Sequence, residues 1–147
     1  MAIEIQNIHR PQEGSLLSQV GELNAAEFGA VDQYFSERVK NREDLLLTVA
    51  TAGDRVIGYK MGYRDESDRF YSWLGTVHAD YRRQGVASKL MEWQHAWCKE
   101  HGYQTIRTKT KNKWRSMLLL NIKSGFDVIG TYTDDKGEPK IILEKKL

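Results

Sequence analysis

The chain has 147 residues, of which 40% are hydrophobic and 29% charged, and its formal net charge is +2. This length suits one domain, and so small a net charge does not by itself indicate a nucleic-acid or membrane partner. No apolar run approaches the roughly 20 residues of a membrane span, and the lone cysteine, Cys98, excludes an intramolecular disulfide. We therefore expect one soluble domain, residues 1–147, in the reducing cytoplasm and without membrane association.

The first 40 residues change from strand-like to helical spacing. Alternating isoleucines near the N-terminus predict a strand that stops before Pro11. From Ser15 to about Lys40, apolar residues recur at helical intervals, and Gly29 divides this stretch into two predicted helices.

Residues 45–77 have the spacing of strands separated by short polar turns, at 52–54 and 65–68. The predicted strands are 45–51, 55–64 and 70–77. Because side chains alternate between faces along a strand, we expect the large residues of the middle strand on one face and its glycines on the other. The large face is Ile57, Tyr59, Met61 and Tyr63, and the small face is Gly58 and Gly62. This region is predicted to be an antiparallel meander.

The second half of the sequence alternates helices with strands. The predicted elements are a helix over 86–101, a strand over 103–110, a helix over 113–123, and a hairpin of strands 126–133 and 140–144. The full order, β-αα-βββ-α-β-α-ββ, predicts an α+β (mixed α/β) domain with a central, mostly antiparallel mixed sheet of about six to seven strands and about four helices. The first of these helices, which ends near Gly102, links two strands in a parallel step.

The junction from Val77 to Leu90 is the most informative segment. A predicted strand enters it, an amphipathic helix leaves it, and two arginines, a glycine and small residues lie between. The free N–H groups of a helix N-terminus bind anions, and successive N–H groups from Arg83 to Ser88 suit a pyrophosphate. Gly85 permits close approach of the backbone. The alternative is that the arginines are solvated surface residues and the glycine belongs to an ordinary turn.

The same segment resembles the signature of the GCN5-related N-acetyltransferase (GNAT) superfamily, Arg/Gln-x-x-Gly-x-Gly/Ala. It is read here as Arg82-Arg83-Gln84-Gly85-Val86-Ala87. The resemblance covers nearly the whole chain, because the element order matches and Asn112, a helix and Gly125-Phe126 meet a second family feature. Ala79 stands where the family often has proline, so we expect a looser loop without loss of function.

The resemblance implies a GNAT-like fold that binds acetyl-CoA and transfers its acetyl group to an amine. It further implies that the strand end at 74–77 is splayed from the strand at 104–110, so that pantetheine lies in the gap and pairs with free backbone groups near Val77. The residues expected to bind the cofactor are Val77, Arg82, Arg83, Gln84, Gly85, Val86, Ala87, Ser88, Asn112 and Asn121.

Direct attack of a neutral amine on the thioester requires removal of a proton and benefits from an acid at the leaving thiolate. Many family members use a glutamate on the strand before the signature, but residues 70–77 contain no carboxylate. The remaining candidates, each of which also suits a surface turn, helix or loop, are Glu22, Glu27, Glu37, Glu66, Asp68 and His78. We therefore assign no general acid or base and expect binding and orientation to carry much of the rate.

Asn121 occupies the place, four residues before the glycine of Gly-Phe, where many members have a tyrosine acid. Asparagine cannot transfer a proton at neutral pH, but it can donate a hydrogen bond to the sulfur or the pantetheine. Relatives of the ribosomal-protein N-terminal acetyltransferases carry asparagine here. The resemblance implies a positioning role, and the alternative is a polar helix residue that faces solvent.

Other patterns have ordinary structural explanations beside functional ones. A basic stripe alternates through residues 107–115 and suits a solvated face, the 3′-phosphate, an acidic partner or nucleic acid. It consists of Arg107, Lys109, Lys111, Lys113 and Arg115. Aromatic candidates for an acceptor pocket are Tyr34, Phe35, Tyr71 and Trp73. The histidines lack metal-ligand spacing, so no metal site is expected, and Cys98 falls in an apolar helical stripe as a core residue.

The leading hypothesis is an acetyl-CoA-dependent N-acetyltransferase that acts by direct attack in a ternary complex. Its acceptor is an amine of a small molecule or a protein, which the sequence does not identify. A homodimer is compatible with the sequence. The alternative is a non-catalytic module that uses the same fold to sense acyl-CoA or to bind nucleic acid. Turnover with a panel of amines, compared with binding alone, distinguishes the two.

Overall fold

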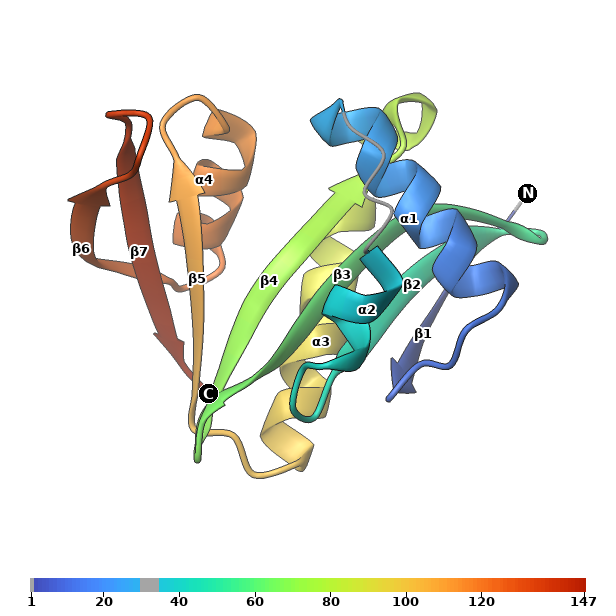
Figure 1. Cartoon of the computed structure of the whole chain (residues 1–147), viewed down its shortest axis with the longest axis horizontal. Helices are drawn as coiled ribbons and strands as arrows, with labels where there is room; N and C mark the ends of the chain where they lie inside the picture. The colour runs from blue at the N-terminus through green and yellow to red at the C-terminus, as the bar shows by residue number, and fades with distance from the viewer. Residues whose placement is uncertain (1, 30–34) are drawn as a thin grey trace.

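The computed structural model describes residues 2–29 and 35–147, and the seven strands in these residues form one sheet (Figure 1). The strand order is β1-β2-β3-β4-β5-β7-β6. The strands are β1 (Ile3–His9), β2 (Leu46–Ala52), β3 (Arg55–Glu66), β4 (Arg69–Val77), β5 (Thr105–Lys111), β6 (Asp127–Thr133) and β7 (Pro139–Lys146). The helices are α1 (Ser15–Phe28), α2 (Phe35–Lys40), the short 3-10 helix η1 (Ala79–Tyr81), α3 (Val86–Glu100) and α4 (Arg115–Lys123).

The predicted α+β fold and its order of elements are confirmed. Neighbouring strands pair antiparallel except β4 and β5, which are parallel and joined by α3. Gly29 ends α1 with a left-handed φ of 74°, where the sequence predicts the break. The turn predicted at 65–68 is shorter, because β3 continues through Glu66 and β4 begins at Arg69. None of the helices in the described residues is long and apolar enough to cross a membrane.

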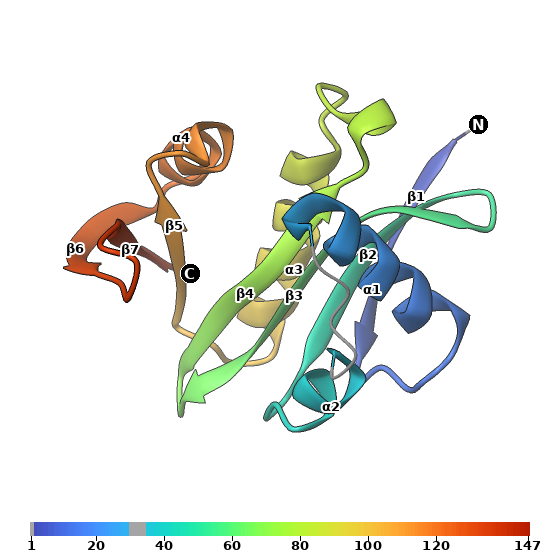
Figure 2. The same cartoon turned by 45° about the horizontal axis from the view of Figure 1, so that its top comes forward.

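Helices cover both faces of the sheet (Figures 1 and 2). On one face, Val20 of α1 and Val39 of α2 pack in a cluster with Tyr59 of β3. On the other face, Leu90 of α3 packs beside the sheet, and α4 extends this layer by packing Leu118 against a cluster shared with α3 and β7. The central strands are therefore buried on both sides.

One irregularity in β3 changes the expected distribution of side chains. The pairing register with β2 shifts by one residue, which makes Ile57 an extra residue in β3. Such a bulge interrupts the alternation of faces, and Ile57 packs with Leu90 on the α3 face. Tyr59, Met61 and Tyr63 share the α1 face as expected. The prediction that Ile57 lies on the same face as these three residues is wrong, because a strict period of two has no place for an extra residue.

A second irregularity, in β4, opens the sheet. The pairing register with β3 shifts at Trp73, which is an extra residue in β4. The pairing of β4 with β5 ends at the same level, where Ser72 opposes Thr108. Beyond this point the two strands diverge (Figure 1), and the edge of residues 73–77 has no pairing with β5. The splay implied by the family resemblance is thus confirmed, and we call this divergence the V.

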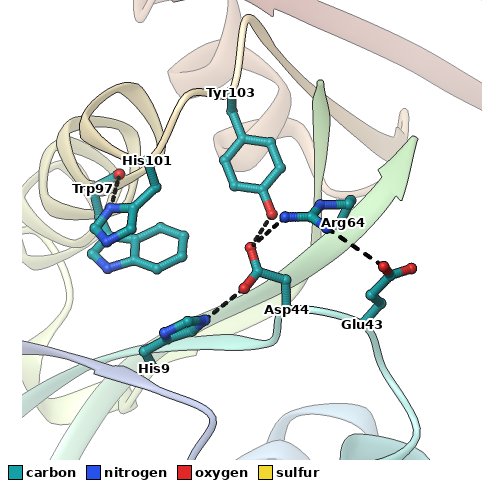
Figure 3. A network of polar contacts seen from close by, with 7 residues as sticks. All are labelled: His9, Glu43, Asp44, Arg64, Trp97, His101 and Tyr103. Carbon is teal, nitrogen blue, oxygen red and sulfur yellow. Dashed lines mark hydrogen bonds and ion pairs between the residues drawn. The ribbon is translucent and has the colours of Figure 1, made fainter. Parts of the chain in front are cut away.

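A polar network around Asp44 lies near the closed end of the V (Figure 3). The Asp44 carboxylate accepts a hydrogen bond from the Tyr103 hydroxyl, and it lies 2.6 Å from His9 Nε2 and 3.4 Å from an Arg64 nitrogen. Asp44 lies two residues before β2, and its backbone has a left-handed φ of 55°. Its side chain is only 11% exposed. Since His9 ends β1, Arg64 lies in β3 and Tyr103 precedes β5, one carboxylate joins segments far apart in the chain.

Candidate active site

The loop between β4 and α3 lies at the open end of the V and is tightly organised. His78 Nδ1 accepts a hydrogen bond from the Asp80 N–H at 3.1 Å, and His78 Nε2 lies 2.9 Å from the Arg55 guanidinium. The backbone then enters the left-handed region at Arg83, with a φ of 62°, and again at Gly85, with a φ of 79°. A non-glycine residue at positive φ is uncommon and strained, so the loop is held in one specific shape.

The N-terminus of α3 presents free backbone donors to open space. The first N–H group of the helix that has a backbone acceptor is that of Lys89, which donates to the Gly85 carbonyl at 3.1 Å. The N–H groups of Val86, Ala87 and Ser88 come earlier in the helix and have no acceptor one turn before them. A Cβ placed on Gly85 would meet no atom within 4 Å. Together with the helix dipole, these donors can bind an anion.

The side chains of the predicted cofactor residues separate into two groups. Those of Arg83, Gln84 and Ser88 are exposed around the loop. That of Val86 is 2% exposed and packs beneath the loop in the α3 layer, so only its N–H faces the anion position. The exposed side chains of Arg83, Gln84 and Ser88 and the start of α3 therefore surround the open space at the loop.

Arg82 is turned toward the protein instead of the open space. Its Nε donates to the Val77 carbonyl at 2.9 Å, and a terminal nitrogen donates to the carboxylate of Glu27. This guanidinium fastens the loop to the end of β4 and to α1. The Val77 carbonyl, one of the backbone groups expected to be free for pantetheine, is consequently occupied by Arg82.

The two predicted asparagines lie in different environments. Asn112 is exposed in the turn after β5, whereas Asn121 of α4 is 2% exposed. The backbone carbonyl of Asn121 accepts the Phe126 N–H at 3.0 Å, which closes the end of α4. The alternative that Asn121 faces solvent is wrong, and its burial is consistent with a positioning role.

The carboxylates considered as bases all belong to segments other than the unpaired edge of β4. Glu66 and Asp68 are exposed at the opposite, closed end of the V, where β3 turns into β4. Glu27 is engaged by Arg82. The two others, both exposed on helices, are Glu22 and Glu37. His78 is equally unsuited, because both its ring nitrogens have partners, Arg55 at the start of β3 and the Asp80 N–H in the loop.

Two groups of side chains that flank the V are not among the residues predicted from the sequence. On the α1–α2 face, the Arg42 guanidinium lies 4.5 Å from the centre of a Trp73 ring and 4.7 Å from that of Tyr63. On the α3 face, Lys60 is 9% exposed and donates to Ser72 Oγ at 3.2 Å. A lysine inside the otherwise apolar run of β3 is the signal that could have indicated the second group.

The aromatic residues predicted for an acceptor pocket are only partly brought together. Tyr71 and Trp73 are half-buried on β4, and both contact the ring of Tyr63 at 5.6 Å between centroids. Phe35 is 6% exposed and packs in the core under α1 instead. Tyr34 lies outside the described residues.

Most of the basic stripe on β5 and beyond has acidic partners on β7 and the β6–β7 turn. The ion pairs are Arg107–Glu144 at 2.7 Å, Lys111–Asp134 at 2.7 Å and Lys113–Glu138 at 3.5 Å. Lys109 instead lies over the rings of Tyr71 and Tyr132. This arrangement favours the interpretation of the stripe as a structural face rather than a site for nucleic acid.

Two further features bear on alternative chemistry. Among residues 2–29 and 35–147, no group of three or more His, Cys, Asp or Glu side chains is arranged to hold a metal ion. Cys98 is fully buried in α3, and burial raises the pKa of its thiol, which keeps it protonated and unreactive at neutral pH.

A parallel strand pair that splays beyond a bulge, with an anion-binding loop at its open end, is the architecture expected of an acetyltransferase of the GNAT type. Residues 5–115 match the Acetyltransferase (GNAT) family, and the chain belongs to this family. No curated protein matches the chain significantly by sequence.

Solved structures share the whole fold at low sequence identity. The ribosomal-protein-S18-alanine N-acetyltransferase from Escherichia coli has a TM-score of 0.78 at 17% identity, over 96% of this chain and 94% of that one. Ard1 from Thermoplasma volcanium has a TM-score of 0.80 at 16% identity, over 100% and 99%. An aminoglycoside 6′-N-acetyltransferase complexed with coenzyme A has a TM-score of 0.80 at 13% identity, over 99% and 97%. At such identities the likeness extends to the fold alone.

Proposed function

We propose that the protein is an N-acetyltransferase, which transfers the acetyl group of acetyl-CoA to a primary amine by direct attack in a ternary complex. The observation that carries the proposal is the loop of residues 82–88, which presents free N–H groups at the open end of the V. Family membership supports the reaction class, and a structural neighbour complexed with coenzyme A supports the donor.

The residues present fit this cofactor. Two left-handed turns and the first N–H groups of α3 form a concave donor surface of the kind that holds a pyrophosphate, with the exposed side chain of Arg83 beside it. The unpaired edge offers backbone groups to the amides of pantetheine at residues 73–76, since the Val77 carbonyl is taken by Arg82. Asn121, buried in α4, would donate a hydrogen bond near the sulfur end.

In this reaction the amine nitrogen bonds to the acyl carbon and the C–S bond breaks. The amine loses one proton and the departing thiolate takes one up. Acetyl-CoA supplies the activated acyl group, and the chain binds and orients both substrates at the V. Correct positioning alone can contribute roughly 7–11 kcal/mol in the best cases, so the reaction does not depend on a carboxylate base on β4.

We propose the amine of a small molecule or a protein as the acceptor and the cytoplasm as the compartment. The buried, unpaired thiol of Cys98 is compatible with a reducing environment. The rival, a module that senses acyl-CoA or binds nucleic acid without catalysis, predicts no release of thiol with any amine. The ion-paired basic stripe argues against its nucleic-acid form.

Reversing the charge of Arg83 tests the loop. The Arg83→Glu variant is expected to bind acetyl-CoA about tenfold more weakly or worse, because a carboxylate then lies beside the pyrophosphate. Isothermal titration calorimetry measures the affinity, and Lys136→Glu, in the exposed β6–β7 turn, is the matched charge reversal that should bind like wild type. An unchanged affinity of Arg83→Glu would refute the loop assignment. Absence of acetyl-CoA binding to wild type at millimolar ligand would refute the proposed function itself.

Removing the Trp73 ring tests the acceptor side of the V. Trp73→Ala is expected to raise the KM for the amine about tenfold, because it deletes the aromatic surface against which Arg42 packs. The KM for acetyl-CoA should change less than about twofold. Steady-state kinetics with each substrate varied in turn separate the two effects. Trp93→Ala is the control, since Trp93 is 46% exposed on α3 and on the other face. A rise confined to the KM for acetyl-CoA would contradict the assignment.

A further inference from the structure

A cluster of basic and polar side chains, all buried except the partly exposed Lys145, lies on the α3 face of the sheet, next to the point where β4 and β5 part. Lys60 of β3 donates to Ser72 Oγ at 3.2 Å, and Lys145 of β7 lies 3.2 Å, Nζ to Nδ1, from His95 of α3. Lys60, Ser72 and His95 are 9%, 5% and 8% exposed. None of these residues belongs to the loop that we assign to the pyrophosphate. We call them the basic cluster.

The basic cluster has cations and no counter-ion. In the described part of the chain, the ammonium groups of Lys60 and Lys145 contact Ser72 and His95, and no carboxylate pairs with either. Burying an ammonium without an opposite charge is costly. Burial accordingly lowers the pKa of Lys60 to about 8, and burial with the nearby positive charges of Lys145 and Lys60 lowers that of His95 to about 3. An anion in the cluster would relieve these unfavourable interactions.

Polar atoms around the basic cluster are also left without partners. His95 Nε2 is buried and makes no hydrogen bond, and the same holds for both amide atoms of Gln94, whose side chain is fully buried. Buried polar atoms in native proteins almost always have partners. Three orphaned atoms on two neighbouring residues of α3, one of which contacts Lys145, therefore indicate a position that a polar ligand group completes.

The basic cluster lies along the path that the acyl end of the donor would take. Ser72 is the last residue of β4 that pairs with β5, and its carbonyl accepts the Thr108 hydroxyl at 3.0 Å. The Lys60 side chain runs beneath the unpaired edge, since its Cγ is 3.1 Å from where a Cβ on Gly75 would stand. A cofactor held at the loop by its pyrophosphate would extend along this edge with its thioester toward Ser72.

We propose that the basic cluster binds a carboxylate at the end of a short acyl chain, so that the preferred donor is a dicarboxylic acyl thioester of coenzyme A, such as succinyl-CoA. This inference rests on the proposed function, because it assumes that coenzyme A binds at the loop. The Lys60 and Lys145 ammonium groups hold the carboxylate, and the Gln94 amide and the His95 ring supply the remaining hydrogen bonds. Transfer of the succinyl group proceeds as for acetyl: the amine nitrogen bonds to the acyl carbon, the C–S bond breaks, the amine loses one proton and the thiolate takes one up.

The test compares succinyl-CoA with butyryl-CoA, which has a similar chain without the carboxylate, and with acetyl-CoA. Isothermal titration calorimetry is expected to show that succinyl-CoA binds at least about tenfold more tightly than butyryl-CoA. The reason is that the succinyl carboxylate makes charge-assisted hydrogen bonds, whereas the butyryl methyl group makes none. Lys60→Met should abolish this preference and leave the affinity for butyryl-CoA within about twofold of wild type. Lys99→Met, at the exposed end of α3, should keep the preference.

A second readout does not depend on turnover or on the stability of the variants. In wild-type protein carrying ¹³Cε-labelled lysine, the Lys60 resonance should shift on addition of succinyl-CoA and not of butyryl-CoA. Equal affinities for succinyl-CoA and butyryl-CoA would overturn the inference and leave the proposed function standing. So would saturation of the Lys60 shift by free succinate at the same concentration as by succinyl-CoA. Failure of all three thioesters to bind would overturn both proposals.

Discussion

Replacing Gly62 with alanine is expected to lower the free energy of unfolding by about 3 kcal/mol. A Cβ on Gly62 would lie 2.3 Å from a ring carbon of Phe70 and 2.5 Å from the carbonyl oxygen of Tyr71. Phe70 is fully buried in the α3 layer, and the carbonyl is part of the main chain, so neither can move aside cheaply. The methyl group can be accommodated only by displacing β4 from β3.

The same substitution should also weaken the binding of acetyl-CoA. Gly62 opposes Ser72, one residue before the bulge at Trp73 that lets β4 leave β5. A shift of β4 at this level changes the width of the V and the direction of the unpaired edge. Urea unfolding and calorimetric titration measure the two effects separately.

Gly130→Ala is the matched control for Gly62→Ala. Gly130 lies in β6, and a Cβ there would touch only Ile142 Cδ1, at 4.0 Å. Alanine restricts the unfolded chain, so we expect a change within about 0.5 kcal/mol or a small gain in stability. If the two variants unfolded at the same urea concentration, the close packing of β3 on β4 at Gly62 would not be the cause of the loss.

The contrast between Gly62 and Ile57 shows how far periodicity can predict a fold. The sequence pattern predicts the order of elements and the presence of Gly62 opposite the large face of β3. It does not predict the bulges at Ile57 and Trp73, because an extra residue in a strand is defined only against the partner strand. The bulge in β4 matters most, since pairing with β5 ends beside it.

The candidate site divides in the same way between local and long-range information. The pyrophosphate loop is contiguous in sequence, so its glycine, its small residues and the following helix are visible together. The basic cluster is not, because Lys60 and Ser72 are 12 residues apart and His95 and Lys145 are 50 apart. Only the pairing of β3, β4, β5 and β7 places these side chains under the V. The sequence therefore indicates the donor's phosphate end better than its acyl end.

Neutralising Asp44 is expected to cost about 2 kcal/mol of stability at neutral pH, a typical value for hydrogen bonds to a charged group. Asp44→Asn keeps the size of the side chain but removes the charge that faces His9, Arg64 and Tyr103 (Figure 3). Since the Arg64 side chain is 38% exposed and that of His9 37%, solvent screens part of the loss and keeps it below that of a fully buried pair. Asp54→Asn, in the exposed β2–β3 turn, should change stability by less than about 0.5 kcal/mol.

The pH dependence distinguishes the charge of Asp44 from a loss of packing. Burial acts to raise the pKa of Asp44, but the hydrogen bond from Tyr103, the contact with His9 and the charge of Arg64 outweigh burial and hold the pKa below the ordinary 3.8. A carboxyl whose pKa is lowered by folding stabilises the protein fully above its unfolded pKa, and this stabilisation is lost as the pH falls through the folded pKa. The difference in unfolding free energy between wild type and Asp44→Asn should therefore shrink below about pH 4 and be smaller at pH 3 than at pH 7. If urea unfolding gave the same difference at pH 3 as at pH 7, the network would act through its shape and not through the carboxylate's charge.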